Sequence, residues 1–349
     1  MNNKGIQILK NGGLFVLLLA LTFYIILKDN SPGQILDAVS RVQVPYILIG
    51  ICAMAVFLCC EALNIARCLK LFGYETSRLS ALKYAAVGFF FSSITPSASG
   101  GQPMQVYYMY KDGVEVSHST LALLFELLSF ETVTVTLSVI GFFYQKDVIS
   151  TSMGNLKYLL LIGLGLNLIV MVLLIMAIFS KKAIKKAAAA VVKLVGIFSK
   201  SKGENLAQQL AQQIAEYQRS ARYFKENKAI FAKTLATTLT QILAMYSIPF
   251  LIYKGFGLGD FHAVEVIALQ AVLYVAVSAL PLPGALGVSE SAFMILFRTL
   301  FPAGILSSAM VLSRGISFYL FVLLTGLCVA GGVLIKKKGA GYGLYNTHC

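Results

Sequence analysis

The sequence has little of what soluble proteins are rich in. Its 349 residues include no tryptophan, three histidines and only 13% charged residues. A soluble domain carries about 25% charged residues and about 45–50% apolar residues with glycine included. Here 58% of the residues are hydrophobic before glycine is counted. This composition excludes an ordinary soluble globular protein, so we expect a single integral membrane domain over residues 1–349.

Cysteine and histidine are too scattered for a disulfide framework or a metal site. Five of the six cysteines lie in or next to apolar runs: Cys52, Cys59, Cys60, Cys68 and Cys328. Such cysteines are typical of small buried side chains. The three histidines are far apart: His118, His262 and His348. Because they form no recognised ligand spacing, we expect structural or loop roles for them and no metal or other cofactor.

Short motifs that suggest soluble enzymes are weak here. Residues 97–101 look like an exposed nucleophile turn, but no histidine has a defined relation to them. The glycines at 255–259 have no strand before them, so a dinucleotide site is not predicted. A Walker A sequence is also missing, which indicates that any transport is downhill or coupled to an ion.

Six apolar runs predict membrane-spanning helices. The first, residues 14–27, follows Lys4 and Lys10 but lacks a small-residue cleavage pattern, so we expect it to be retained. Five longer runs cover residues 46–66, 121–143, 158–179, 230–252 and 305–335. Each is long enough to cross a hydrocarbon core of about 30 Å. The sequence therefore predicts an all-α polytopic membrane protein with about six full transmembrane helices.

Two further segments, residues 84–103 and 264–301, do not fit the pattern of simple spans. Their apolar stretches run into the sequences PSASGGQP at 96–103 and PLPGALG at 281–287. Irregular backbone at membrane depth is tolerated only where protein buries it or where it lines a wet cavity. We therefore expect two broken or re-entrant helical segments. Loops outside the membrane are the alternative.

The basic residues predict the orientation. Lys and Arg number 29 against 15 Asp and Glu, and they cluster beside particular spans. The clusters are Arg67, Lys70, Arg78 and Lys83, then Lys181, Lys182, Lys185 and Lys186, then Lys336 to Lys338. The positive-inside rule places these clusters and both termini in the cytoplasm of a cell-membrane protein. Segment 84–103 then enters the first half, residues 12–180, from the cytoplasm, and segment 264–301 enters the second half, residues 229–335, from outside. This arrangement predicts an inverted repeat.

Residues 181–228 form a basic linker, with eleven Lys and Arg against three Glu. Apolar residues recur there at helical spacing, so we expect a cytoplasmic amphipathic helix on an anionic leaflet. A solvated loop is the equally weighted alternative. Residues 336–349 form a basic cytoplasmic tail. We expect no nucleic-acid binding, because the lysines lie next to the membrane.

Charged residues inside the predicted spans are candidate functional groups. Glu131 lies about 16 Å from the start of its helix, and Glu126 is turned from it by about 140°, so we expect different partners for the two carboxylates. Arg314 is the expected cation for Glu131. Glu290 starts a short helix, where capping and substrate contact are equally favoured. Glu61 is expected to reach the cytoplasmic interface.

Two signatures resemble a known family. The first is GFFFSSITP at 88–96 with GGQP at 100–103, followed by YYMYKDG at 107–113 and LALLFE at 121–126. The second is LPLPGALGVSE at 280–290, with Arg314 following. Together they resemble the lysylphosphatidylglycerol synthase transmembrane-region family, the flippase-like membrane half of the multiple peptide resistance factor. The resemblance implies a lipid-handling bundle with re-entrant helices.

Three positions depart from the family pattern. Glu126 is followed by leucine where the family has arginine, Gln102 replaces a common acidic residue, and Gly284 is followed by alanine. These changes put the charge of the headgroup site, and so the substrate, in question. The large aminoacyltransferase domain of full-length relatives is not found after residue 335, so we expect no aminoacyl transfer by this chain.

Three functions stay open from the sequence. The leading one is a flippase or scramblase for a phospholipid such as lysyl-phosphatidylglycerol, and a protein of this kind is expected to bind anionic phospholipid headgroups. Gly100, Gly101, Gln102, Gly284, Gly287 and Arg314 would hold the phosphate, and Glu126 and Glu131 would receive a cationic headgroup or relay protons. The alternatives are the membrane part of a phosphatidylglycerol lysyltransferase, alone or with a separate synthase subunit, and a small-solute secondary transporter. An oligomer is compatible with each.

Overall fold

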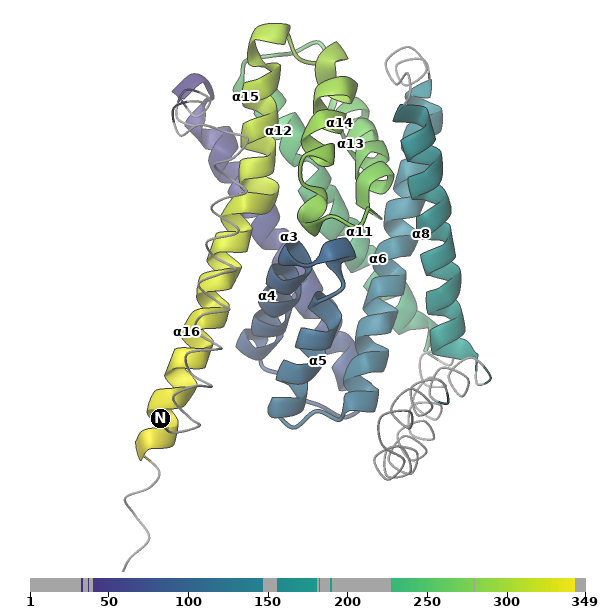
Figure 1. Cartoon of the computed structure of the whole chain (residues 1–349), viewed down its shortest axis with the longest axis vertical. Coiled ribbons are helices and arrows are strands. Elements are labelled where there is room, and N and C mark those ends of the chain that lie inside the picture. Colours follow the sequence, from purple (N-terminus) through teal and green to yellow (C-terminus); the bar gives the residue numbers. More distant parts are fainter. Residues whose placement is uncertain are drawn as a thin grey trace, which may run out of the picture.

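The computed structural model describes residues 40–146, 156–180, 227–278 and 280–342, together with the single residues 33, 37, 182 and 189. Within these ranges the chain is helical and contains no strand. The helices run mostly along the long axis of the molecule (Figure 1). The prediction of an all-α fold is confirmed. The predicted first span at 14–27 and nearly all of the linker at 181–228 lie outside the described residues.

Five helical stretches among the described residues are long and apolar enough to cross a membrane. They comprise α3 (Val44–Lys70), α6 (Val116–Tyr144), α8 (Leu156–Phe179), the pair α11 (Lys228–Tyr246) and α12 (Ile248–Gly255), and α15 (Ala303–Arg314) continued by α16 (Leu320–Tyr342). These stretches match the five longer apolar runs of the sequence. Helix α16 extends beyond residue 335, to Tyr342.

The first broken segment is a helical hairpin. It consists of α4 (Arg78–Ile94), the 3-10 turn η1 (Pro96–Ala98) and α5 (Gly101–Lys111). Proline disfavours helical backbone at the residue before it, and Thr95 is accordingly extended, with φ −112° and ψ 146°. Helix α5 then packs back against α4.

Close approach of α4 and α5 depends on glycine. Gly101 is buried at the start of α5. A Cβ atom there would lie 2.9 Å from the carbonyl oxygen of Gly88 and would also collide with the side chain of Ser92. The glycines of the first signature therefore bring the two half-length helices into contact.

The second broken segment has the same plan. It consists of α13 (Ala263–Ser278), the 3-10 turn η2 (Pro283–Ala285) and α14 (Val288–Leu296), which leads through the short turn η3 (Phe297–Thr299) into α15. Leu282 before Pro283 is extended, with φ −119° and ψ 137°. The chain reverses at Gly284, whose φ of 58° lies in the left-handed region that glycine adopts readily.

The two hairpins enter the bundle from opposite ends, and their tips meet near its middle (Figure 1). Turn η1 contacts turn η2, and α4 also contacts η2. The order of span, broken hairpin and span occurs twice in opposite orientations. This is the arrangement that an inverted repeat predicts.

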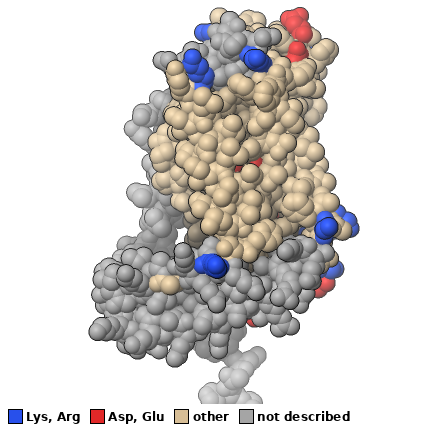
Figure 2. All heavy atoms as spheres, turned by 90° about the vertical axis from the view of Figure 1, so that its right-hand side faces the viewer, with Lys and Arg blue, Asp and Glu red and all other residues tan. Residues whose placement is uncertain are grey.

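Apolar packing surrounds the hairpins. One core lies among α3, α12, α13, α14 and α15 and contains Tyr253, Phe293 and Phe297. A second lies among α3, α4, α5 and α6 and contains Ile65 and Phe125. The face that α8 covers is a broad band of uncharged residues, with Lys and Arg gathered toward the two ends (Figure 2). This distribution is typical of a helical bundle surrounded by lipid.

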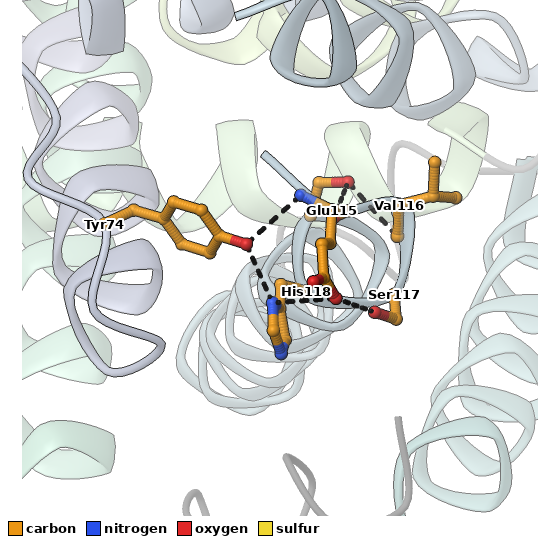
Figure 3. Close-up of polar contacts among 6 residues, drawn as sticks. Tyr74, Glu115, Val116, Ser117 and His118 are labelled. Atoms are coloured by element: carbon orange, nitrogen blue, oxygen red, sulfur yellow. Dashed lines mark hydrogen bonds and ion pairs between the residues drawn. The ribbon is translucent and has the colours of Figure 1, made fainter. Parts of the chain in front are cut away.

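His118 belongs to a polar cluster at the start of α6 (Figure 3). The Tyr74 hydroxyl lies 3.0 Å from His118 Nδ1 and accepts a hydrogen bond from the Glu115 N–H at 3.2 Å. The Phe72 ring stacks on the imidazole with 4.7 Å between ring centroids. These contacts tie the connection between α3 and α4 to the start of α6. The structural role expected for this histidine is in keeping with them.

Candidate functional site

Arg314 is held in a fixed orientation where the two hairpins meet. Its Nε donates to Glu290 Oε1 at 2.9 Å, and its Nη2 donates to the carbonyl oxygen of Gly284 at 2.9 Å. The ring of Phe318 lies 4.6 Å from the guanidinium carbon. Two donors and a cation–π contact thus fix the guanidinium plane.

The local helix geometry positions these partners. Arg314 is the last residue of α15, and a π-helical turn, Gly315–Tyr319, follows it. Turns of this kind recur at functional sites because they displace side chains from the regular helical positions. Phe318 and Tyr319, both in this turn, contact Arg314 and Glu290 respectively.

Glu290 both caps a helix and binds the arginine. Its Oε2 accepts the N–H of Gly287 at 2.7 Å, which satisfies a donor at the start of α14. Its Oε1 accepts Arg314 Nε and, at 3.2 Å, the hydroxyl of Tyr319. Both side chains of the ion pair are mostly buried, with exposed fractions of 16% for Arg314 and 11% for Glu290.

The expected pairing of Arg314 with Glu131 is wrong. Arg314 is bound by Glu290, while Glu131 lies on α6, which packs against α13. Tyr246 and Tyr274 are instead among the neighbours of Glu131. Its Oε2 is buried and has no hydrogen-bond partner among the described residues.

The glycines of both signatures lie at the hairpin junction. Gly100 donates its N–H to the hydroxyl of Thr95 at 2.9 Å, and Gly101 and Gln102 begin α5 directly after η1. Gly284 lies in η2, and Gly287 precedes α14. The structure thus brings Gly100, Gly101, Gln102, Gly284, Gly287, Glu290 and Arg314 to one region, because η1 and η2 are in contact.

Helix ends add to the electrostatics of this junction. Both α5 and α14 begin beside it, so their positive N-terminal ends converge there. No backbone hydrogen bond uses the N–H groups of Gly101 and Gln102 among the described residues, as is usual in the first turn of a helix. Oriented N–H groups and a guanidinium together favour an anion.

Sequence reasoning misplaced Glu61 and missed Gln105. The expectation that Glu61 reaches the cytoplasmic interface is wrong, because its Oε1 accepts a hydrogen bond from Gln105 Nε2 inside the bundle at 3.1 Å. Gln105 is 3% exposed and fits there because Gly88 has no side chain. The helical spacing of Glu61, which puts it on the same stripe of α3 as the buried Asn64 and Cys68, was the available signal.

Glu126 and Glu131 form a separate acidic group on α6. Glu126 is 8% exposed, with Glu61 and Tyr274 among its neighbours. A few acidic atoms are visible within the otherwise uncharged band (Figure 2). Among the described residues, no group of three or more His, Cys, Asp and Glu side chains is arranged to hold a metal ion.

Comparisons with known proteins agree with this architecture. The family model described as the lysylphosphatidylglycerol synthase TM region matches residues 12–325, which include both hairpins and Arg314. A UPF0104 membrane protein of Archaeoglobus fulgidus is 27% identical over 274 residues, which cover 76% of this chain and 80% of that relative. The multi-pass bundle is in accord with both matches. The chain belongs to the lysylphosphatidylglycerol synthase TM region family.

Proposed function

We propose that this membrane protein moves a phospholipid between the two leaflets and that the hairpin junction receives the lipid phosphate. The observation that carries the proposal is Arg314, fixed between Glu290 and the carbonyl oxygen of Gly284 where two half-length helices begin. An intramembrane cation with a fixed orientation is costly to keep and is by default a functional group.

The hydrogen bonds of Arg314 leave capacity for a ligand. A guanidinium carries five N–H donors, of which the contacts to Glu290 and Gly284 use two. The others fit two oxygens of a phosphate in the bidentate geometry that guanidinium groups favour. Backbone N–H groups of Gly101 and Gln102 provide further donors in the same region.

The acidic group on α6 suits a cationic part of the headgroup. Glu126 and Glu131 lie apart from Arg314, so one lipid carrying both phosphate and ammonium groups would meet opposite charges at different places. Lysyl-phosphatidylglycerol has this charge pattern, and the description of the family names that lipid. We propose lysyl-phosphatidylglycerol as a cargo, and also phosphatidylglycerol, which lacks the cationic group.

The orientation is part of the proposal. Arg67, Lys70, Arg78 and Lys83 lie where α3 ends and α4 begins. By the positive-inside rule this end faces the cytoplasm of the cell membrane. The first hairpin then enters from the cytoplasmic side and the second from outside, which gives the cargo a polar region near the middle of the membrane.

The cargo is tested with purified protein in liposomes. The measurement is the fraction of inner-leaflet fluorescence that is lost when a quencher is added outside the liposomes. It compares labelled phosphatidylglycerol, lysyl-phosphatidylglycerol and phosphatidylcholine. The proposal predicts movement of the first two lipids above the protein-free control. Solute uptake driven by an ion gradient without lipid movement would instead support a secondary transporter, and synthesis of lysyl-phosphatidylglycerol from charged tRNA would support the lysyltransferase alternative.

A further inference from the structure

The outer face of α5 carries a continuous row of exposed residues. Pro103, Tyr107, Tyr110 and Lys111 are exposed, with exposed fractions of 46% for Tyr107 and 62% for Tyr110. Residues three or four positions apart lie on the same side of a helix, so these four form one stripe. The buried residues of α5 lie on the opposite face: Gly101, Gln105 and Met109.

This stripe connects one end of the bundle to the hairpin junction. Helix α5 runs from the junction toward the end of the bundle (Figure 1). Pro103 lies in its first turn, directly after Gly101 and Gln102, and Lys111 is its last residue. The eight steps between them make about 12 Å along the axis. One leaflet contributes about 15 Å of a hydrocarbon core of about 30 Å. A headgroup that follows the stripe therefore crosses most of one leaflet.

Lys111 is a cation that no described acid neutralises. Its ammonium lies over the ring of Tyr107, 4.3 Å from the ring centroid, and it forms no ion pair among the described residues. The neighbouring Asp112 pairs instead with Lys83 and accepts the hydroxyl of Tyr84 at 2.8 Å. A cation–π contact leaves the three N–H donors of an ammonium available. Lys111 therefore has both charge and donors for a ligand at the surface.

Positive charge prevails at this end of the bundle. Residues 67–116 contain five Lys and Arg against three Asp and Glu, and the start of α11 adds Lys228 and Lys233. Lys70 pairs with Glu75 at 3.2 Å, so its charge is compensated. The remaining charged residues of the range are Arg67, Arg78, Lys83, Lys111, Asp112 and Glu115. An excess of positive charge favours anionic lipids of the adjacent leaflet.

Tyr107 and Tyr110 add hydrogen-bond donors beside Lys111. Among the described residues their rings contact Tyr108 and Lys111, and neither hydroxyl forms a hydrogen bond. Tyrosine suits a membrane boundary because its ring is apolar and its hydroxyl is polar. Two hydroxyls and one ammonium on the same side of a helix match the acceptor oxygens of a phosphate group.

We propose that Lys111, Tyr107 and Tyr110 form an entry site for the phosphate group of an anionic phospholipid from the cytoplasmic leaflet. The site rests on the proposed function, because the headgroup then moves along α5 to the junction. A lysine at the entrance attracts a lipid of net negative charge. Of the two proposed cargoes this favours phosphatidylglycerol, since lysyl-phosphatidylglycerol carries additional ammonium groups that Lys111 repels.

A single introduced tryptophan reports on this site, because the natural chain has none. Tyr110→Trp places the indole in the stripe and retains an N–H donor. The purified variant is reconstituted in mixtures of phosphatidylglycerol and phosphatidylcholine, one of which has brominated acyl chains. Quenching of the indole by each brominated lipid gives the relative binding constant. We expect a preference of about fivefold for phosphatidylglycerol, the effect of one lysine near a membrane surface.

Three substitutions in the reporter protein test which groups bind the lipid. Lys111→Gln is expected to abolish the preference. Tyr107→Phe retains the ring beneath Lys111 and removes only the hydroxyl, so it is expected to reduce the preference. Lys70→Gln removes the same charge from a lysine that is already paired, and it is expected to leave the preference unchanged. Tyr107→Trp serves as the reporter if gel filtration shows that Tyr110→Trp is misfolded.

A second lysine–tyrosine pair provides the matched control. Lys157 lies over the ring of Tyr158, 5.1 Å from the centroid, and Tyr158 is 57% exposed at the start of α8. This helix is a full-length span and not part of a broken hairpin. Tyr158→Trp is expected to show a weaker preference than Tyr110→Trp. Equal preference in the two reporters, or a preference that survives Lys111→Gln, overturns the proposal.

The binding measurement does not depend on lipid movement. A preference that requires Lys111, in a protein that moves no lipid, would keep the lipid site and reject the proposed function. Lipid movement without the preference would do the reverse. Where both are found, Lys111→Gln is expected to slow the movement of phosphatidylglycerol severalfold and Lys70→Gln to leave it at the wild-type rate.

Discussion

Arg314 and Glu290 form a mostly buried ion pair, with 2.9 Å between Nε and Oε1, that joins α15 to the start of α14. The carboxylate also binds the N–H of Gly287, so one acid fixes a helix start and the orientation of a cation. Because Arg314 ties both the turn η2 and the start of α14 to α15, loss of the pair affects stability as well as the site.

Replacement of Glu290 by alanine is therefore expected to be costly. It leaves a buried guanidinium without its counter-charge and a helix start without its cap. Breaking one side of a buried pair typically costs about 3–5 kcal/mol. Denaturant unfolding in detergent micelles measures the loss.

A double-mutant comparison separates the ion pair from the cap. Adding Arg314→Ala to Glu290→Ala is expected to recover part of the lost stability, since the unpaired cation is gone. Glu290→Gln, which retains an acceptor, is expected to lose less than Glu290→Ala. Additive losses in the double variant would contradict a direct interaction between the two side chains.

The close contact between α4 and α5 at Gly101 is tested by adding a methyl group there. Gly101→Ala places a methyl group against Ser92 and the backbone of Gly88, and overpacking of this kind costs about 1–3 kcal/mol. Gly165→Ala on α8 is the matched control, because no atom lies within 4 Å of the added Cβ. It is expected to be neutral or stabilising by up to about 1 kcal/mol. Equal losses in both variants would contradict the hairpin packing.

Lipid exposure of α8 is tested by charge insertion. Leu168 is 40% exposed near the middle of this span, so Leu168→Arg is expected to lower membrane insertion by about 2.5–3.5 kcal/mol. Tyr158→Arg, next to Lys157 at the helix start, is expected to insert almost normally because the side chain reaches the interface. Insertion is measured with a reporter that is modified on only one side of the membrane. Normal insertion of both variants would show that this face does not meet lipid.

The polar cluster at the start of α6 is expected to contribute to stability. Tyr74→Phe removes the hydroxyl that contacts both His118 and the Glu115 N–H (Figure 3). The loss of two hydrogen bonds predicts a decrease of about 1–3 kcal/mol in the free energy of unfolding. Thermal unfolding compares this variant with Tyr110→Phe, whose ring is 62% exposed on α5. Equal melting temperatures would show that the cluster does not stabilise the fold.

Local patterns in the sequence were sufficient to predict much of the fold. Long apolar runs predicted the five described spans, and prolines such as Pro96 and Pro283 marked both hairpin turns. Both signals are local, because the length of an apolar run and the backbone restriction of a proline depend only on residues close together in the sequence. The partner of Arg314 was not predictable in this way. The sequence offered both Glu131 and Glu290 as acidic partners, and the tertiary packing that places Glu290 beside Arg314 decides between them.

Glu61 shows a second limit of sequence reasoning. Its position near the end of a span favours an interfacial side chain, whereas the missing side chain of Gly88 admits Gln105 and so gives the carboxylate a partner inside. That arrangement depends on three helices. The stripe it shares with Asn64 and Cys68 indicates a buried face, but not which groups lie opposite.

Dithionite quenching of fluorescent phosphatidylglycerol in proteoliposomes tests most directly whether lipid movement depends on Arg314. Wild type, Arg314→Ala and the exposed-residue control Glu75→Gln are compared at equal protein content, with folding checked by gel filtration. The account predicts quenching beyond the outer-leaflet fraction for wild type and Glu75→Gln, and quenching limited to that fraction for Arg314→Ala. Wild-type quenching in a folded Arg314→Ala variant would contradict it.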